Sequence, residues 1–256
     1  MRESPGDRRT VEEVLEGIAL RLLGVADTDS GMPSLAHGWR AVAGYEVVPR
    51  YTVAISGENA GEVIDRLWHA AAEELSIYSE DADFLLDLPA PRQDRTGWLR
   101  ARDLRRARLP SRIHSVTGSW EFIALSENGR RLCAVSKEEY DYWIVARTFT
   151  DEQVRRGRES EDRVRAVERE VRNLADRRAS LQEVIAFLGS AELHGPLRRI
   201  TVVGMLVKAC GLSVVESRKI ASMVEYPSGR LLAPAEQVEE AWRNLVTSGG
   251  GDPRRR

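Results

Sequence analysis

Few of the side chains that commonly do chemistry in proteins stand close together in this sequence. The two cysteines, Cys133 and Cys210, lie in different segments among apolar neighbours. The histidines are also scattered, at His37, His69, His114 and His194. Zinc sites combine Cys and His at short, regular spacings, so no metal site is predicted. A disulfide is not expected in a reducing compartment, and we interpret both cysteines as small buried hydrophobic residues.

The motifs of common catalytic and nucleotide-binding sites are absent from the sequence. It contains no glycine-rich phosphate loop, no G-x-S-x-G, no H-E-x-x-H and no calcium loop. Asp141, between Tyr140 and Tyr142, would have a raised pKa and could act as an acid or base if it pointed inward. Strand alternation places it on the solvent face instead. The aromatic residues beside it, with Trp143, are expected in the core rather than in a ligand pocket. We predict no catalytic residue and no cofactor.

Two neighbouring segments carry opposite charge. Residues 73–87 hold six acids and no base, whereas residues 92–112 hold eight arginines against two acids. The favoured interpretation is that the two segments face each other or are solvated. The alternative is that the arginines contact a phosphate-rich or acidic partner, because guanidinium groups pair bidentately with such groups. Trp98 would then stack on a base.

The overall composition indicates an ordinary globular protein. The chain has 256 residues, of which 30% are charged and 42% hydrophobic. Lys and Arg total 38 against 40 Asp and Glu, a net charge of −2, so no overall field draws the protein to nucleic acid or membrane. No apolar run reaches membrane-spanning length, and no targeting signal is recognisable. We predict a cytoplasmic protein without a membrane partner.

An N-terminal domain is predicted over 10–149, and helix-capping patterns and the spacing of apolar residues indicate its first elements. Thr10 forms a capping-box pattern that opens a helix over 11–23, followed by a loop over 25–38. A strand is predicted within 45–56, where Pro49 indicates a sheet edge. Asn59 with Glu62 repeats the capping-box pattern and opens a helix to Leu75.

A three-stranded antiparallel meander completes that domain. Trp120–Leu125 and Arg131–Val135 are strand-like and flank Asn128-Gly129, a pair that favours a tight hairpin turn. Tyr140–Phe149 is rich in aromatic and β-branched residues and predicts the third strand. A helix capped by Ser136 is the competing interpretation of the last segment.

An amphipathic connector helix is predicted over 150–188, opened by Thr150 with Gln153. Its apolar residues alternate spacings of three and four, as in a coiled coil, with Arg178 at the one polar register position. This predicted partner face consists of Val164, Val167, Val171, Leu174, Leu181, Ile185 and Leu188. The face could pair with a second copy of the chain or fold back on its own chain, and both possibilities stay open.

The C-terminal segment predicts a small three-helix domain over 197–247. The helical runs are Ile200–Ala209, Ser213–Val224 and Pro234–Val246, with Gly211 between the first two. Ser213 with Glu216 caps the second helix. Residues 248–256 are rich in glycine and arginine and are expected to be a disordered tail.

The run from Arg199 to Leu212 resembles the first helix and turn of the C-terminal domain of bacterial ribosomal protein L7/L12. Glu216, Arg218 and Ile220 fall where that family places Glu, Lys and an aliphatic residue, and the likeness covers about 199–249. That family recruits translational GTPases through a basic helix face. Because Gly204 and Val207 replace two of the basic positions and no closing strand follows, the resemblance implies a small docking domain rather than a ribosomal stalk.

The same residues allow two other interpretations. The first is a helix-turn-helix in which Arg218 and Lys219 face DNA. Val207 stands where a small residue is usual, Ser217 falls on a core position, and segment 190–250 has only seven bases against six acids, which is weakly basic for a DNA-binding domain. The second is an unrelated three-helix packing unit.

These features predict an α+β protein with a coiled-coil-like helix and a three-helix C-terminal domain. The leading functional prediction is a non-catalytic adaptor for protein–protein interaction. It would bind a protein partner, or self-associate as a homo-oligomer, through the long helix and the C-terminal domain. The alternatives are a DNA-binding transcriptional regulator that uses Arg218 and Lys219, and an enzyme of unrecognised class.

Overall fold

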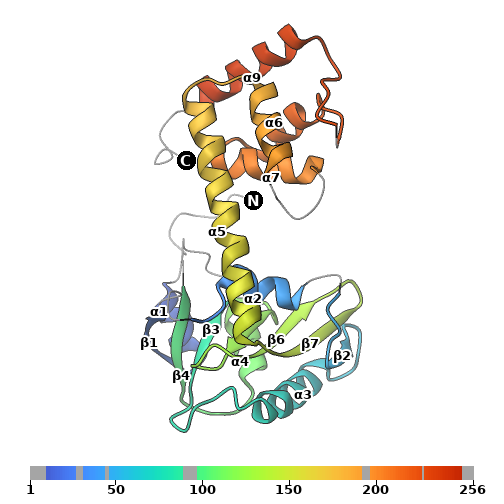
Figure 1. Ribbon diagram of the computed structural model, residues 1–256. Helices are drawn as coiled ribbons and strands as arrows, with labels where there is room; N and C mark the ends of the chain where they lie inside the picture. The colour runs from blue at the N-terminus through green and yellow to red at the C-terminus, as the bar shows by residue number, and fades with distance from the viewer. Residues whose placement is uncertain are drawn as a thin grey trace. The chain divides into compact units, whose positions relative to one another are not determined.

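The computed structural model describes residues 10–26, 31–43, 46–88, 97–191, 197–226 and 228–249. The chain divides into two compact units, Met1–Arg158 and Glu159–Arg256, here named unit 1 and unit 2. Unit 1 is built around an antiparallel sheet, and unit 2 is helical (Figure 1). The α+β class predicted from the sequence is confirmed.

The described residues of unit 1 form a seven-stranded sheet in the order β1-β4-β3-β5-β6-β7-β2, antiparallel throughout. Its strands are β1 (Leu20–Ala26), β2 (Tyr51–Ala54), β3 (Asp83–Asp87), β4 (Trp98–Asp103), β5 (Phe122–Leu125), β6 (Arg131–Lys137) and β7 (Asp141–Thr148). Its helices are α1 (Val11–Gly17), α2 (Leu35–Val42), α3 (Ala60–Glu74) and α4 (Leu109–Thr117).

The central strands are buried on both faces, and alternate residues serve different cores. In β5, Phe122 and Ala124 pack into a cluster with α1, α3 and α4, whereas Ile123 and Leu125 pack with α2 and Val154. The alternation follows from the two-residue period of a strand. The sheet therefore separates two helical layers.

The predicted meander is confirmed as β5-β6-β7, and its third segment is a strand rather than a helix. The hairpin loop is longer than an Asn-Gly turn of two residues, because Ser126 N donates to Arg131 O and Gly129 N donates to Ser126 O. In the Asn-Gly pair only Gly129 takes a positive φ, at 71°. A side chain there would also overlap Met32.

Three local predictions in unit 1 were wrong. The helix predicted over 11–23 ends at Gly17, because Ala19 adopts a φ of 59° and the following apolar residues pair with β4 as β1. The loop predicted over 25–38 includes the start of α2, where Ser34 Oγ accepts a hydrogen bond from His37 N. Asn59 precedes α3 in a left-handed conformation and makes no side-chain cap.

Unit 1 extends into the first turns of α5 (Asp151–Asp176), which begins at the predicted Thr150–Gln153 pair. Unit 2 holds the remainder of α5 with α6 (Leu181–Ser190), α7 (Arg199–Cys210), α8 (Val214–Ala221) and α9 (Ala235–Gly249). The three C-terminal helices match the prediction. A disordered tail was predicted over 248–256, and of these residues 250–256 lie outside the described part of the chain.

The single helix predicted over 150–188 is interrupted at Arg178. Its φ is 57°, Arg178 N donates to Ala175 O, and Ala179 N donates to Leu174 O. These two hydrogen bonds form a Schellman motif, which ends a helix by satisfying its last carbonyl groups. Ser180 and Glu183 then form a capping box that starts α6. The one polar residue in the coiled-coil register is therefore the point where the chain turns.

Within the described ranges, none of the helices combines the length and apolar character that crossing a membrane requires.

The packing of α5 on α2 gives a test of unit 1. A Cβ added at Gly157 would overlap the His37 ring, and Arg158 Nη2 donates to Met32 O at 3.1 Å. We expect Gly157→Ala to destabilise unit 1 by about 1–3 kcal/mol through overpacking, despite the better helix propensity of alanine. Urea unfolding followed by circular dichroism measures this change.

The matched control is Gly204→Ala in the middle of α7, where an added Cβ meets no atom within 4 Å. Alanine should stabilise this helix by about 0.5–1 kcal/mol. Equal effects of the two substitutions would contradict the packing of α5 on α2.

Candidate functional site

The predicted partner face of the long helix is covered inside unit 2. Six of its seven residues are buried, and Val164 is partly buried. They pack in one cluster with residues of α7, α8 and α9, which include Leu206, Ile220 and Trp242. The indole N–H of Trp242 donates to Ala179 O at 2.8 Å, next to the break between α5 and α6. Of the two possibilities that the sequence left open, the structure has the helix folded back on its own chain.

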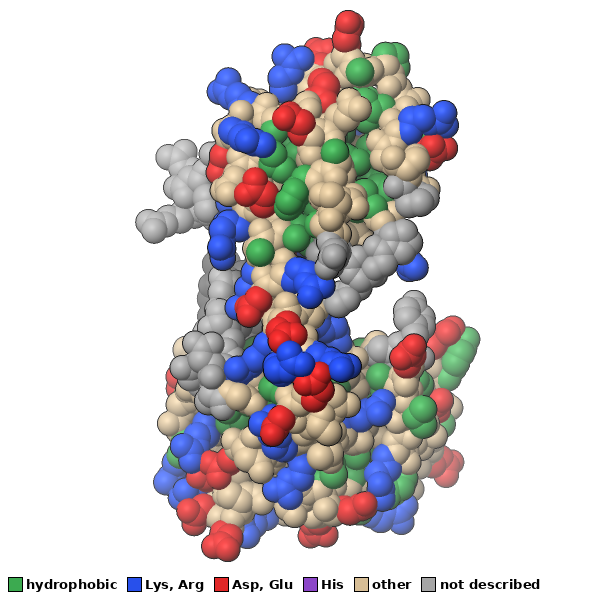
Figure 2. Space-filling view, in the orientation of Figure 1, with side chains coloured by type: hydrophobic (Ala, Val, Ile, Leu, Met, Phe, Trp, Pro, Cys, Tyr) green, Lys and Arg blue, Asp and Glu red, His purple; other side chains and the backbone are tan. Residues whose placement is uncertain are grey.

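The other predicted binding residues, Arg218 and Lys219, lie on the exposed face of α8. This face also carries Val214 and Val215, whose exposed fractions are 49% and 78%, and Ser222 beyond the helix end. The opposite face of α8 is buried through Ser217, Ile220 and Ala221. Apolar and basic side chains therefore lie next to each other on one short, capped helix. Figure 2 shows apolar side chains among charged ones on the visible face of unit 2.

The two cationic groups on α8 are available to a partner. Within the described part of the chain, neither Arg218 nor Lys219 forms an ion pair, whereas Lys208 pairs with Glu168 and Arg230 with Glu225. Part of their role is local, because cations in the last turn of a helix interact favourably with its dipole. That interaction leaves the guanidinium and ammonium groups in solvent.

The connection from α7 to α8 has the local form of a helix-turn-helix. Gly211 ends α7 with a φ of 68°, and Ser213 starts α8 with a capping box to Glu216. Leu212 in the turn is buried. Ser217 is wholly buried, and its Oγ has no hydrogen-bond partner in the described structure.

The oppositely charged segments of unit 1 face each other, as the favoured interpretation predicted. They form the neighbouring strands β3 and β4, in which Asp83 is directly opposite Arg102. Arg102 donates to both oxygens of Asp83 at 2.6 and 3.1 Å, and these hydrogen bonds lower the pKa of Asp83. Trp98 is fully buried, with its indole N–H on Pro33 O, and does not offer a stacking surface. Arg92 and Arg95 lie outside the described residues.

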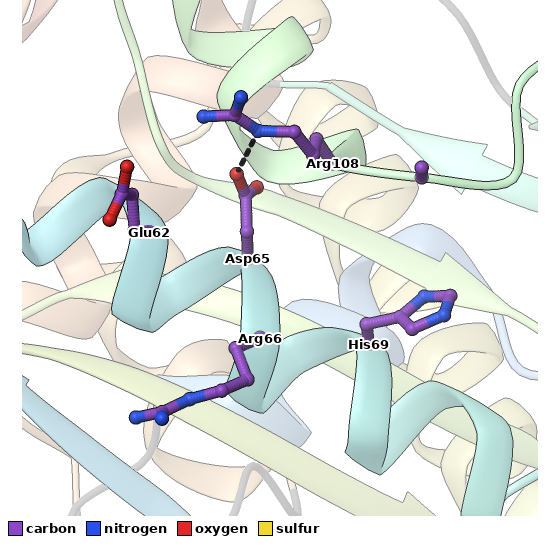
Figure 3. Close-up of a pocket in the computed structure, with 6 residues that line it drawn as sticks. Glu62, Asp65, Arg66, His69 and Arg108 are labelled. Carbon is purple, nitrogen blue, oxygen red and sulfur yellow. Dashed lines mark hydrogen bonds and ion pairs between the residues drawn. The ribbon is translucent and has the colours of Figure 1, made fainter.

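An open basin lies where α3 meets the loop before α4 (Figure 3). Asp65 is buried there and accepts hydrogen bonds from Ser111 N at 2.9 Å, Ser111 Oγ at 2.6 Å and Arg108 Nε at 3.2 Å. Asp65 thus supplies from α3 the cap that α4 lacks in its own sequence. Figure 3 shows Arg66 and His69 pointing away from this pair. The carboxylate therefore joins α3 to the start of α4, through Ser111 and Arg108.

The remaining reactive side chains are dispersed. Burial raises the pKa of the Cys133 thiol far above its usual range and that of Cys210 to about 11, so neither thiol is activated. Asp141 is partly exposed at the start of β7. Tyr142 and Trp143 pack into different cores on opposite faces of the sheet, so they do not line one pocket. In the described part of the chain, no His, Cys, Asp or Glu cluster is suited to a metal ion.

Comparison with protein-family models, with characterised proteins and with solved structures finds no match.

Two sequence signals mark the break between α5 and α6. Ser180-Leu-Gln-Glu183 has the same capping-box pattern as Thr10 and Ser213, and it marks the start of α6. Arg178 marks the end of α5. By contrast, no local signal identifies Asp65 as the cap of α4, because its partner Ser111 lies 46 residues along the chain.

The burial of Leu174 gives a second prediction. Leu174→Asp places a carboxylate in the core of unit 2, where Leu174 is 4% exposed. We expect unit 2 to lose more than about 3 kcal/mol, because both the apolar contacts and the hydration of the charge are lost. Circular dichroism should show lost helix content and lowered urea resistance.

Arg169→Asp is the control, because Arg169 is exposed on the same helix. If Leu174→Asp remained fully helical and only reduced the mass seen by light scattering, the face would be an interface between copies.

Proposed function

We propose that this protein is a non-catalytic adaptor that docks an acidic protein segment on the exposed face of α8. The proposal rests on one observation: that face carries two exposed valines next to two exposed cations, namely Val214, Val215, Arg218 and Lys219. Exposed apolar side chains give a partner anchors to bury. The adjacent cations favour a partner segment that bears Asp or Glu.

Charge balance supports a protein partner over nucleic acid. Segment 190–250 has seven bases and six acids, and two of the bases, Lys208 and Arg230, are already in ion pairs. DNA-binding domains neutralise several phosphates and are distinctly basic. Two free cations beside two valines suit an amphipathic acidic segment better than a phosphate backbone.

Selection of displayed random peptides against the full chain tests this proposal. The peptides recovered should be enriched in acidic residues and contain an apolar anchor. Their affinity should fall roughly tenfold or more, about 1.4 kcal/mol, for Val215→Asp and for the Arg218→Glu, Lys219→Glu double variant. Each side chain is exposed, so the variants should fold normally.

Arg169→Glu, which removes a cation on α5, should leave the peptide affinity unchanged. The proposal is contradicted if the recovered peptides are not enriched in acidic residues. It is also contradicted if the α8 substitutions leave the peptide affinity unchanged.

The second candidate is duplex DNA, and the observation that favours it is the helix, Gly211 turn and capped helix formed by α7 and α8. Fluorescence anisotropy with a short random-sequence duplex distinguishes the two candidates. A DNA-binding role requires affinity that falls steeply with salt and is lost in the Arg218→Glu, Lys219→Glu variant. The adaptor role predicts only weak binding near physiological salt.

A further inference from the structure

A pocket in unit 1 is lined by cationic and hydroxyl groups. It lies between the loop that follows β4 and the exposed side of α4, and it adjoins the basin of Figure 3 through Ala107 and Arg108. Its volume is about 360 Å³. The lining residues are Arg105, Ala107, Arg108, Ser111, Arg112 and Ser115. None of these six residues is a carboxylate, but Asp65 pairs with Arg108 and Asp103 pairs with Arg112, so Arg105 is the lining cation without an ion pair in the described part of the chain.

A buried ion pair fixes the loop that carries these arginines. Asp103 has a fully buried side chain, and both its oxygens accept from Arg112 Nη2 at 2.8 and 2.7 Å. Its Oδ1 also accepts from Arg105 N at 3.0 Å and Arg106 N at 3.1 Å. Arg112 is held further by Ile18 O and Ala107 O. Arg112 is therefore a positioning residue whose charge is compensated by Asp103.

The backbone of the loop is strained at two arginines. Arg106 and Arg108 have φ values of 51° and 53°, in the left-handed region where glycine and asparagine are favoured. A residue with a Cβ raises the conformational free energy of the folded backbone at such a position, whereas glycine does not. Of the two, Arg108 lines the pocket, whereas the Arg106 guanidinium donates to Glu80 O.

Two guanidinium groups remain available in the pocket. Arg105 is exposed and forms no ion pair in the described part of the chain. The Arg108 side chain is 65% exposed and donates to Asp65 through Nε, and its two terminal nitrogens make no hydrogen bond in the described part of the chain. Each guanidinium fork can bind a phosphoryl group through two parallel hydrogen bonds.

We propose that this pocket binds the diphosphate group of a small phosphate ester or of an inorganic polyphosphate. Arg105 and Arg108 each bind one phosphoryl group, and Arg112 and Asp103 hold the loop in the binding conformation. The site is separate from α8 and does not depend on the proposed adaptor function.

Isothermal titration calorimetry of the full chain with pyrophosphate tests the proposal, at low ionic strength and without divalent cations. Saturable binding at one site per chain is expected. Arg105→Gln and Arg108→Asn should each weaken it at least tenfold. Asparagine tolerates the left-handed backbone at position 108, so the second variant removes the charge and the Nε contact to Asp65 without adding backbone strain.

Two further variants separate the pocket from general charge effects. Arg21→Gln removes one exposed cation on β1 and should bind pyrophosphate like the unaltered chain. Ala107→Asp keeps every arginine but adds a carboxylate to the lining, and it should also weaken binding at least tenfold. Circular dichroism confirms that each variant is folded.

A parallel titration with a nucleoside diphosphate identifies the source of the group. Equal affinity supports recognition of the diphosphate alone, and tighter binding supports a nucleotide ligand. The proposal is overturned if pyrophosphate shows no saturable binding, or if Arg105→Gln and Arg108→Asn bind it as Arg21→Gln does.

Discussion

The aliphatic face that runs from α5 into α6 must be covered, and the organisation of unit 2 depends on how this happens. An extended coiled coil would need a second chain along its whole length. Instead, Arg178 ends α5 in a Schellman motif, so α6 turns back and joins α7, α8 and α9 around the same core. Because the face is covered within the chain, the proposed docking uses side chains outside it. On the exposed face of α8, apolar and basic groups lie together in solvent.

Unit 1 depends on buried carboxylates that join distant segments. Asp103 holds Arg112 and the loop after β4, and Asp65 caps α4 from α3. A buried ion pair is costly to break, because the remaining charge loses both its partner and its hydration. These two acids therefore fix the arginine-rich loop in one conformation. Asp83, Arg100 and Arg102 are likewise used for pairing between β3 and β4, whereas Arg105 and Arg108 face the open pocket beside α4.

Much of the fold could be predicted from local patterns, and the failures have physical reasons. The meander, α3 and the three C-terminal helices were found from strand alternation, apolar helical spacing and the Ser213 cap, although the Asn59 cap predicted for α3 does not form. Leu20–Leu23 continues the helical spacing of α1 but also suits a strand, and only pairing with β4 decides between them. β3 and β4 were missed because they lie in segments whose acids and arginines suggest solvated chain until the two strands are paired. For the candidate sites, Arg218 and Lys219 were predicted as exposed cations, whereas the pocket around Arg105 requires contacts that no local pattern encodes.

The organisation of unit 2 rests on the burial of the 164–188 face within a single chain. Amide hydrogen exchange of this segment, measured by mass spectrometry across a roughly hundredfold dilution, tests that claim directly. Amides within a folded core open with a free energy that does not depend on protein concentration, whereas protection that comes from association weakens on dilution. The account predicts the same protection of Val167–Leu174 and Leu181–Leu188 at every concentration. Protection that falls as the protein is diluted would show that a second chain covers this face.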